Sequence, residues 1–369
     1  MAFYNKFIFI GNIGIAKDKE KFYNSFLNDK GTWRSSKINF MIKESDHNAV
    51  FVELFGGYMA DGKGKVFSKD LENNNIEIPW ADRNNPETLK MVADMKKFKV
   101  NFGEQKEFIT EFDMIECLKD ELPKITSPVV VTGQIKHKEY KGKYTDVFII
   151  KTIRLAKEDE KNKLSANIEI YYSKDSLDTD DFKEEKIIKL AGFVPQYIDK
   201  EIGIKYMPHP FILSAKKLDF TNEKHVEKFE FLKKYLTVKT KTYVHIPWQM
   251  TVFRGADEVE WNESMLTKAQ KEQVAFGLSE VDDFKPKSNM LGGNIYEYRL
   301  TKPLLVGDFS EGVVDSEIKI EEFENTNVFV PVEKTEKFKE PKENKSEQTV
   351  ESESKTDEVI SKDDEDLFS

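Results

Sequence analysis

Cysteine is nearly absent from this sequence: Cys117 is the only one among 369 residues. One cysteine excludes a disulfide framework within the chain and a zinc site built from several thiolates, and it fits a reducing compartment. No apolar run approaches the ~20 residues that span a bilayer. The apolar stretch at residues 7–10 is too short for a secretory signal. We therefore expect a soluble, cytoplasmic protein.

Motifs of familiar catalytic chemistry are also missing. The run Asp61–Lys65 is a glycine-containing turn, not a phosphate-binding loop that opens a helix. Acidic pairs such as Asp180–Asp181 and Asp282–Asp283 lie in polar runs typical of solvated loops. No metal-ligand spacing connects the five histidines, which are His47, His137, His209, His225 and His245. We expect no catalytic residue, no cofactor and no metal site.

The net charge is −10, and it is unevenly distributed along the chain. Residues 332–369 hold 13 acids and 7 bases, whereas the preceding residues are close to balanced. Lys, Glu, Ser and Thr dominate this C-terminal stretch and aromatics nearly vanish, which is typical of a disordered tail. With 28 Phe in the whole sequence, the rest of the chain can build at least one sizeable core.

Three stretches near the N-terminus have the composition and alternation of β-strands: residues 6–11, 33–43 and 49–56. Alternate residues form an apolar face on the second and third of these stretches. The face consists of Ile38, Phe40 and Ile42 in the second, and of Val50, Val52 and Leu54 in the third. Phe51 and Phe55 then lie on the opposite face. Large aromatics on an outer face indicate either a covering insertion or a platform for stacking.

Helical spacing of apolar residues appears after the first predicted strand and again after the third. Phe22 and Phe26 predict a short helix within residues 19–28. Residues 56–82 read as loops. Two helices should follow, one from Pro86 with a stripe of Leu89, Val92 and Phe98, and one from Glu104 with Phe108, Phe112, Ile115 and Leu122. We expect a helical insertion over residues 83–127.

Two β-rich runs separated by a glycine-containing turn predict a hairpin over residues 129–155. One face of its first run is apolar and should belong to the core. The other face is basic, and between Gln134 and Arg154 there are six Lys or Arg against two acids. Cations followed by an aromatic, Tyr140, can hold phosphates and stack a base. The alternative is an edge hairpin whose lysines merely prevent aggregation.

A second β-rich block follows a charged break at residues 157–163. Four stretches indicate strands, at residues 168–172, 187–194, 211–215 and 242–246. Helices are predicted at residues 223–236, with Asn222 as a cap, and at residues 267–278, and one more strand at residues 294–306. Strands, a helix and a further strand indicate a second small barrel.

The predicted fold is mainly β with inserted helices (α+β). Three strands, helices and a hairpin give the order of a five-stranded OB barrel, which has a helix between its third and fourth strands. The predicted domains are residues 1–157 with the insertion 83–127, residues 164–331 and the tail 332–369. The second domain is predicted to be small and β-rich, and its order of elements favours a diverged OB repeat.

Residues 1–155 also resemble bacterial and phage single-stranded DNA-binding proteins. The resemblance lies in Lys6–Gly14 (KFIFIGNIG), Val52–Gly56 (VELFG) and Val131–Tyr140 (VTGQIKHKEY). It places Phe55 and Tyr140 on base-stacking positions of that family. The chain departs from the family at Ala49, where the relatives carry tryptophan, and has no counterpart of a second tryptophan around Glu44–Asp46. By the resemblance, the protein coats single-stranded DNA in replication, recombination or repair, in the host cytoplasm if it is phage-encoded.

The predicted nucleic-acid site combines cations and rings of this barrel: Trp33, Arg34, Lys37, Lys43, Phe51, Phe55, Tyr58, Lys136, Lys138, Tyr140, Lys143 and Tyr144. Each of these residues also has an interpretation without DNA binding. The lysines could be ordinary solvated surface residues, and Phe51 could be buried under the helices. Two rival functions remain: a single-stranded RNA binder on the same fold, and a β-barrel interaction or virion protein whose aromatics are core.

The C-terminal end carries a second functional signal, an acidic run followed by an apolar tip: Asp363, Asp364, Glu365, Asp366, Leu367 and Phe368. It resembles the tails with which single-stranded DNA-binding proteins dock on replication and repair enzymes, and implies partner binding through residues 357–369. In that family the aromatic is the last residue, whereas Ser369 follows it here. The alternative is a generic solubilising tail.

Overall fold

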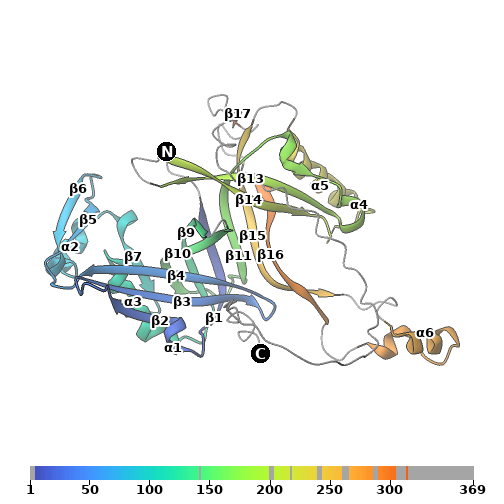
Figure 1. Ribbon diagram of the computed structural model, residues 1–369, viewed down its shortest axis with the longest axis horizontal. Helices are drawn as coiled ribbons and strands as arrows, with labels where there is room; N and C mark the ends of the chain where they lie inside the picture. Colours follow the sequence, from blue (N-terminus) through green and yellow to red (C-terminus); the bar gives the residue numbers. More distant parts are fainter. Residues whose placement is uncertain are drawn as a thin grey trace, which may run out of the picture. The chain divides into compact units, whose positions relative to one another are not determined.

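Alternating apolar side chains organise this chain into two rings of paired β-strands (Figure 1). The computed structural model describes residues 5–140, 143–198, 203–216, 218–238, 243–259, 266–285, 290–304 and 313–314. All of them belong to one compact unit, Met1–Asn327. The predicted disordered tail, residues 332–369, lies outside the described residues.

The first ring contains the strands predicted near the N-terminus and the central hairpin. Its members are β1 (Lys6–Gly14), β3 (Trp33–Ser45), β4 (Asn48–Met59), β9 (Val129–Tyr140) and β10 (Lys143–Leu155). They pair in the order β1–β3–β4–β10–β9, and β9 pairs back with β1. All pairings are antiparallel except that of β4 with β10, where Ile149 faces Glu53.

The predicted apolar faces of these strands form the core of the first ring. Ile38, Phe40 and Ile42 are buried, as are their partners on β4 and the apolar face of β9. The ring closes through glycines at which backbones approach closely. A Cβ at Gly133 would lie 1.8 Å from the carbonyl oxygen of Ile149, and one at Gly11 would lie 2.1 Å from that of Lys43. Only glycine fits at such contacts.

The predicted helix over residues 19–28 is wrong beyond its first turn. A short helix, α1 (Lys19–Phe22), is followed at once by a strand, β2 (Tyr23–Leu27). β2 pairs along its whole length with β3, from Tyr23 opposite Ile38 to Leu27 opposite Arg34. The hydrogen bonds offered by the edge of β3 therefore outweigh the helical spacing of Phe22 and Phe26.

The segment between β4 and β9 is less helical than predicted. Its predicted loops contain a hairpin, β5 (Lys65–Lys69) and β6 (Asn75–Pro79), and the short η1 (Trp80–Asp82). The helix predicted from Pro86 ends at Met91 (α2, Pro86–Met91) and is followed by η2 (Asp94–Lys96). Phe98, predicted on a helical stripe, begins a second hairpin of β7 (Phe98–Asn101) and β8 (Gln105–Phe108).

The helix predicted from Glu104 begins later, because Thr110 caps α3 (Glu111–Glu121), whose last turn continues into η3 (Leu122–Lys124). β7 adds to β10 in parallel, which explains why Phe98 and Val100 are buried in a strand. The buried face of α3 packs into the core of the first ring through Met114, Ile115 and Leu118.

The second ring repeats the strand order of the first. Its members are β11 (Lys163–Tyr172), β13 (Ile187–Tyr197), β14 (Ile204–Ser214), β15 (Val244–Val259) and β16 (Met290–Pro303). β11 pairs with β13, β13 with β14, β14 with β16 in parallel, β16 with β15, and β15 with β11. The predicted strands of the second block are confirmed, and each except β16 runs further than expected.

The predicted helix over residues 223–236 is confirmed as α5 (Glu223–Leu236), and Asn222 caps it by accepting from the backbone of Lys224. α5 lies between the third and fourth strands of the second ring, where α3 lies in the first. The remaining elements are η4 (Lys174–Ser176), β12 (Leu177–Asp178), α4 (Phe182–Glu185), α6 (Lys268–Ala275), η6 (Val281–Phe284) and β17 (Val313–Val314).

The two rings share hydrogen bonds and a core. The first strands of the rings pair antiparallel, with Lys6 opposite Asn167 and Ile10 opposite Lys163. The same part of β1 pairs with β9 on its other edge. Buried residues of both rings belong to one contiguous hydrophobic cluster. In the described residues, no helix is long and apolar enough to cross a membrane.

Candidate nucleic-acid interface

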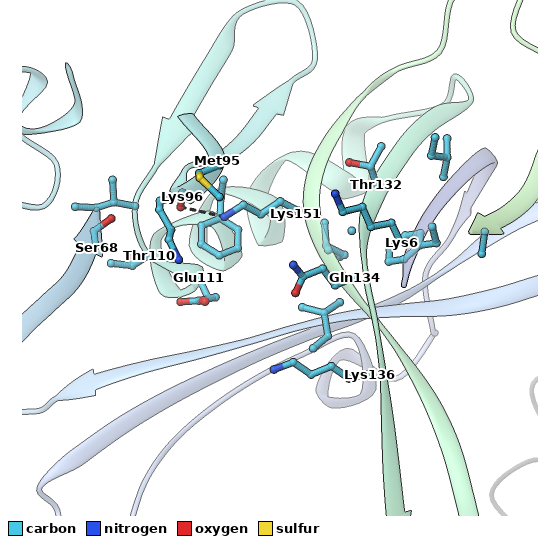
Figure 2. Close-up of a pocket in the computed structure, with 18 of the residues that line it drawn as sticks. Lys6, Ser68, Met95, Lys96, Thr110, Glu111, Thr132, Gln134, Lys136 and Lys151 are labelled. Atoms are coloured by element: carbon cyan, nitrogen blue, oxygen red, sulfur yellow. Dashed lines mark hydrogen bonds between the residues drawn. The ribbon is translucent and has the colours of Figure 1, made fainter. Parts of the chain in front are cut away.

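A groove with a volume of about 1030 Å³ lies over the outer face of the first ring and reaches the start of the second (Figure 2). Strands β1, β9 and β10 line it, together with the β5 hairpin, the η2 turn and residues of β11 and β15. Among the described residues, its lining contains six lysines and one acid, Glu111; the lysines are Lys6, Lys65, Lys96, Lys136, Lys151 and Lys163. We call this site the lysine groove.

Lys151 is the most unusual cation of the lysine groove. Its ammonium group donates a 2.9 Å hydrogen bond to the carbonyl oxygen of Lys96, drawn as the dashed line in Figure 2, and lies 3.6 Å from the centre of the Phe98 ring. Burial lowers the pKa of Lys151 to about 8, and the nearby charge of Lys96 acts in the same direction. A phosphate beside Lys151 would favour its charged form.

Rings and apolar side chains accompany the lysines. Phe67 on the β5 hairpin is 76 % exposed and Met95 on η2 is 70 % exposed, and both line the groove. Trp80 lines it too, but it is buried and stacks on Tyr58 at 4.5 Å between ring centres. Among the described residues that line the groove, Phe67 is therefore the exposed aromatic side chain, whereas Trp80 is part of the wall.

A cluster of ion pairs lies beside the lysine groove. Glu53 on β4 accepts from Lys37 on β3 at 2.7 Å and from Lys138 on β9 at 3.1 Å. Burial by itself would raise the pKa of Glu53, but the two lysines outweigh it and hold the pKa below its ordinary value. Glu53 lies opposite Ile149, which lines the groove, so one carboxylate holds two predicted DNA-binding lysines at the groove edge.

The structure does not bring all of the predicted site residues together at one site. Among them, Lys136 lines the lysine groove. Phe55 is 52 % exposed and lies opposite Lys37, and Trp33 is 42 % exposed. Arg34 lies opposite Tyr58 in the register of β3 and β4.

Three other members of the predicted set have intramolecular neighbours. Phe51 has the guanidinium of Arg254 5.4 Å from its ring centre. Lys43 is half-buried and lies opposite Ala49. Tyr58 stacks on Trp80 and meets Phe112 edge-on. The side chains of Tyr140, Lys143 and Tyr144, like the tail tip Asp363–Phe368, lie outside the described residues.

Sequence reasoning missed most of the lysine groove. Lys6, Lys65, Lys96 and Lys163 come from four separate segments, and Phe67 comes from a stretch that reads as loop. No local pattern connects them. The pairing of β1 with β9 and β11 brings Lys6 and Lys163 together, and the hydrogen bond from Lys151 on β10 brings in the backbone of Lys96. Lys151 could have been predicted, because it belongs to the excess of basic residues between Gln134 and Arg154.

The structure also brings together three side chains with metal-ligating atoms. His209 lies 63 residues after Asp146 in the sequence, yet the ligating atoms of His137, Asp146 and His209 all lie within 4.8 Å of one another. His137 and Asp146 are opposite each other on β9 and β10, and His209 belongs to β14 of the second ring.

Comparisons with known proteins give little for this chain. No family profile matches the sequence, and no curated protein matches it. One solved structure with some similarity is a deletion mutant of the single-stranded DNA binding protein from Thermus aquaticus, at a TM-score of 0.26 and 10% sequence identity. That match covers 68% of this chain and 89% of the other.

Proposed function

We propose that this protein binds single-stranded DNA along the lysine groove. The observation that carries the proposal is the charge of the groove, six lysines against one carboxylate, in a chain whose net charge is −10. Such a local excess attracts a polyanion, and the neutralised phosphates release their counterions on binding. The protein itself is not expected to be an enzyme.

The exposed aromatic side chains at the groove favour single-stranded over double-stranded DNA. Stacking on an exposed aromatic is worth ~1–3 kcal/mol per base and requires bases that are not already paired. Phe67 within the groove and Phe55 beside it both expose their rings. Every base has a π-face, so binding of this kind tolerates any sequence.

We propose further that both rings are OB barrels. Each has the neighbour order first–second–third–fifth–fourth, a parallel pairing of the third and fifth strands, and a helix between the third and fourth. In this fold the face of the second and third strands, here β3 and β4, and the flanking loops bind oligonucleotides. The lysine groove lies instead over the first, fourth and fifth strands, β1, β9 and β10. Lys163 and Gln249 of the second ring line the groove, so the second barrel supplies part of the same surface.

In a cell, such a protein would coat and protect single strands during replication, recombination or repair. Its acidic tail, residues 357–369, would recruit partner proteins: the acids steer to a basic rim, and Leu367–Phe368 fill an apolar pocket. Removing residues 357–369 should leave the affinity for DNA unchanged or raised while abolishing the capture of replication or recombination proteins. A sharp loss of DNA affinity would contradict this role.

The main proposal is tested by titrating labelled oligo-dT with the full chain at several salt concentrations. We compare the wild type with a groove variant, Lys96→Gln, Lys136→Gln and Lys163→Gln combined. The slope of log affinity against log salt changes by ~0.7 per phosphate contact on a single strand, so losing three contacts should flatten it by about 2. We expect the affinity to fall at least tenfold.

The matched control removes three exposed lysines of the second ring and its helices, in Lys183→Gln, Lys224→Gln and Lys228→Gln. It has the same net charge as the groove variant and should bind almost like the wild type. Absence of salt-sensitive binding, or equal losses in both variants, would refute the groove. Competition with oligo-U distinguishes the RNA-binding alternative, and a non-binding interaction or virion barrel would show no affinity for either.

A further inference from the structure

The buried group His137, Asp146 and His209 lies where the β9–β10 hairpin of the first ring meets the second ring. The three side chains are 2 %, 4 % and 5 % exposed, respectively. His137 Nδ1 contacts Asp146 Oδ1, and His209 Nε2 lies 2.7 Å from Asp146 Oδ2. One carboxylate is therefore clamped between two imidazoles that come from different rings.

Both ring nitrogens of His209 face hydrogen-bond acceptors. His209 Nε2 faces the carboxylate of Asp146, and His209 Nδ1 faces the carbonyl oxygen of Pro210 at 3.1 Å. A neutral imidazole has one donor and one lone pair, so one of its two nitrogens would direct a lone pair at an acceptor. A metal ion on Nε2 removes that repulsion, as does a proton on Nε2 or on the carboxyl group of Asp146.

The surroundings match those of a metal-bound histidine. In such sites the nitrogen that does not bind metal usually donates to a backbone carbonyl or carboxylate, as Nδ1 of His209 can to Pro210. The backbone of His137 is held from both sides by Gln196, which accepts from its N–H at 2.6 Å and donates to its carbonyl at 3.0 Å. The imidazole of His209 is thus positioned by a contact outside the group. The Nε2 atom of His137 is buried and has no hydrogen-bond partner among the described residues.

We propose that His137, Asp146 and His209 form a binding site for one divalent transition-metal ion of the zinc class. Two imidazoles and a carboxylate are a common ligand set for zinc, with a fourth position left for water or another oxygen. Tetrahedral zinc, with bonds of ~2.0–2.1 Å, separates its ligand atoms by about 3.3 Å. Insertion therefore requires the carboxylate of Asp146 to move away from both histidines, because His137 Nδ1 and His209 Nε2 both lie closer to it than this separation.

Such an ion would tie the hairpin that carries Lys136 and Lys138 to the second ring. Next to the group lie Phe211, stacked on His209 at 4.4 Å between ring centres, and Tyr298, 4.2 Å from the same ring. The hydroxyl of Tyr298 donates to that of Tyr296 at 2.6 Å. These aromatic walls exclude water and strengthen the binding of a charge to the three ligands.

The test uses the full chain, stripped with a chelator and then titrated with Co(II) alone, followed by displacement with Zn(II). We expect one equivalent to bind, with the intense visible bands of a low-coordinate cobalt site, and the midpoint of thermal unfolding to rise with either ion. His209→Gln and Asp146→Asn should each weaken binding at least tenfold. The matched control is His225→Gln, which removes a histidine of α5 outside the group.

The proposal is overturned if no stoichiometric binding is found, or if binding survives His209→Gln and Asp146→Asn. If either variant fails to fold, X-ray absorption of the wild-type zinc protein decides, because scattering from two imidazoles is expected and a first shell without imidazole is incompatible with the site. Nitrogen NMR of the zinc-treated protein gives a third readout. If both ring nitrogens of His209 carry protons in this spectrum, no metal ion is bound to Nε2 and the proposal is refuted.

Discussion

The ammonium group of Lys151 lies 3.6 Å from the centre of the Phe98 ring, and the strands that carry the two residues, β10 and β7, run parallel in one sheet. The contact keeps a cation partly buried at the floor of the lysine groove. Its pKa falls to about 8, so Lys151 changes charge close to physiological pH. Binding of DNA should therefore depend on pH in a range where few groups titrate.

We predict that the affinity for oligo-dT falls as the pH rises from 7 to 9. Lys151 is charged below its lowered pKa and loses its proton above it, which removes one contact to phosphate. The loss should be about threefold to tenfold at constant ionic strength. Lys151→Arg keeps its charge throughout and should bind with much less dependence on pH. A wild type whose affinity is constant across this range would place Lys151 outside the DNA contact.

A second prediction concerns base stacking on Phe67. Phe67→Ala should weaken binding to oligo-dT by ~1–3 kcal/mol, the loss of one stacked base. Phe276→Ala is a matched control, because Phe276 is 78 % exposed against 76 % for Phe67 but does not line the groove. Fluorescence anisotropy of both variants makes the comparison. Equal affinities would show that Phe67 is only a surface residue of the β5 hairpin.

Glu53 gives a third prediction, with a gain of function. Glu53→Gln releases Lys37 and Lys138 from their shared carboxylate, and both cations become available to phosphates. Affinity at low salt should rise about threefold to tenfold, and stability should change by ~1 kcal/mol or less, as for other partly exposed ion pairs. Glu297→Gln, which removes a carboxylate paired to Arg299 on the second ring, serves as control. A reduced affinity of Glu53→Gln would mean that the ion pairs of Glu53 hold β3, β4 and β9 in place for binding, instead of withholding the two lysines from DNA.

A fourth prediction tests how the first ring closes. Gly133→Ala would place its Cβ 1.8 Å from the carbonyl oxygen of Ile149, so β9 and β10 must separate. We expect a loss of about 2 kcal/mol or more in the free energy of unfolding, as for other overpacking substitutions. Gly64→Ala, whose Cβ would meet nothing closer than 3.6 Å, should change stability far less. Denaturant melts that showed the two variants equally stable would contradict the observed pairing.

Local patterns predicted the elements whose residues bury one continuous face. Ile38, Phe40 and Ile42 alternate because one side of β3 is core, and α5 follows its cap at Asn222. Prediction failed where a partner strand decided the outcome. Phe98 has helical spacing, but β10 offers it a strand partner, and Tyr23–Leu27 is extended because β3 has an open edge.

The sequence by itself determined that the chain is rich in strands, that basic residues gather around the hairpin at 129–155, and that acids gather at the C-terminal end. These properties depend on neighbours along the chain. The tertiary structure alone decided which lysines share a groove and that His137, Asp146 and His209 meet. Lys6, Lys136 and Lys163 come from three separate strands, and the register of β1 with β9 and β11 places these strands side by side. His209 comes from the second ring, 63 residues after Asp146. Residues this far apart in the chain meet only where strand pairing brings their segments together.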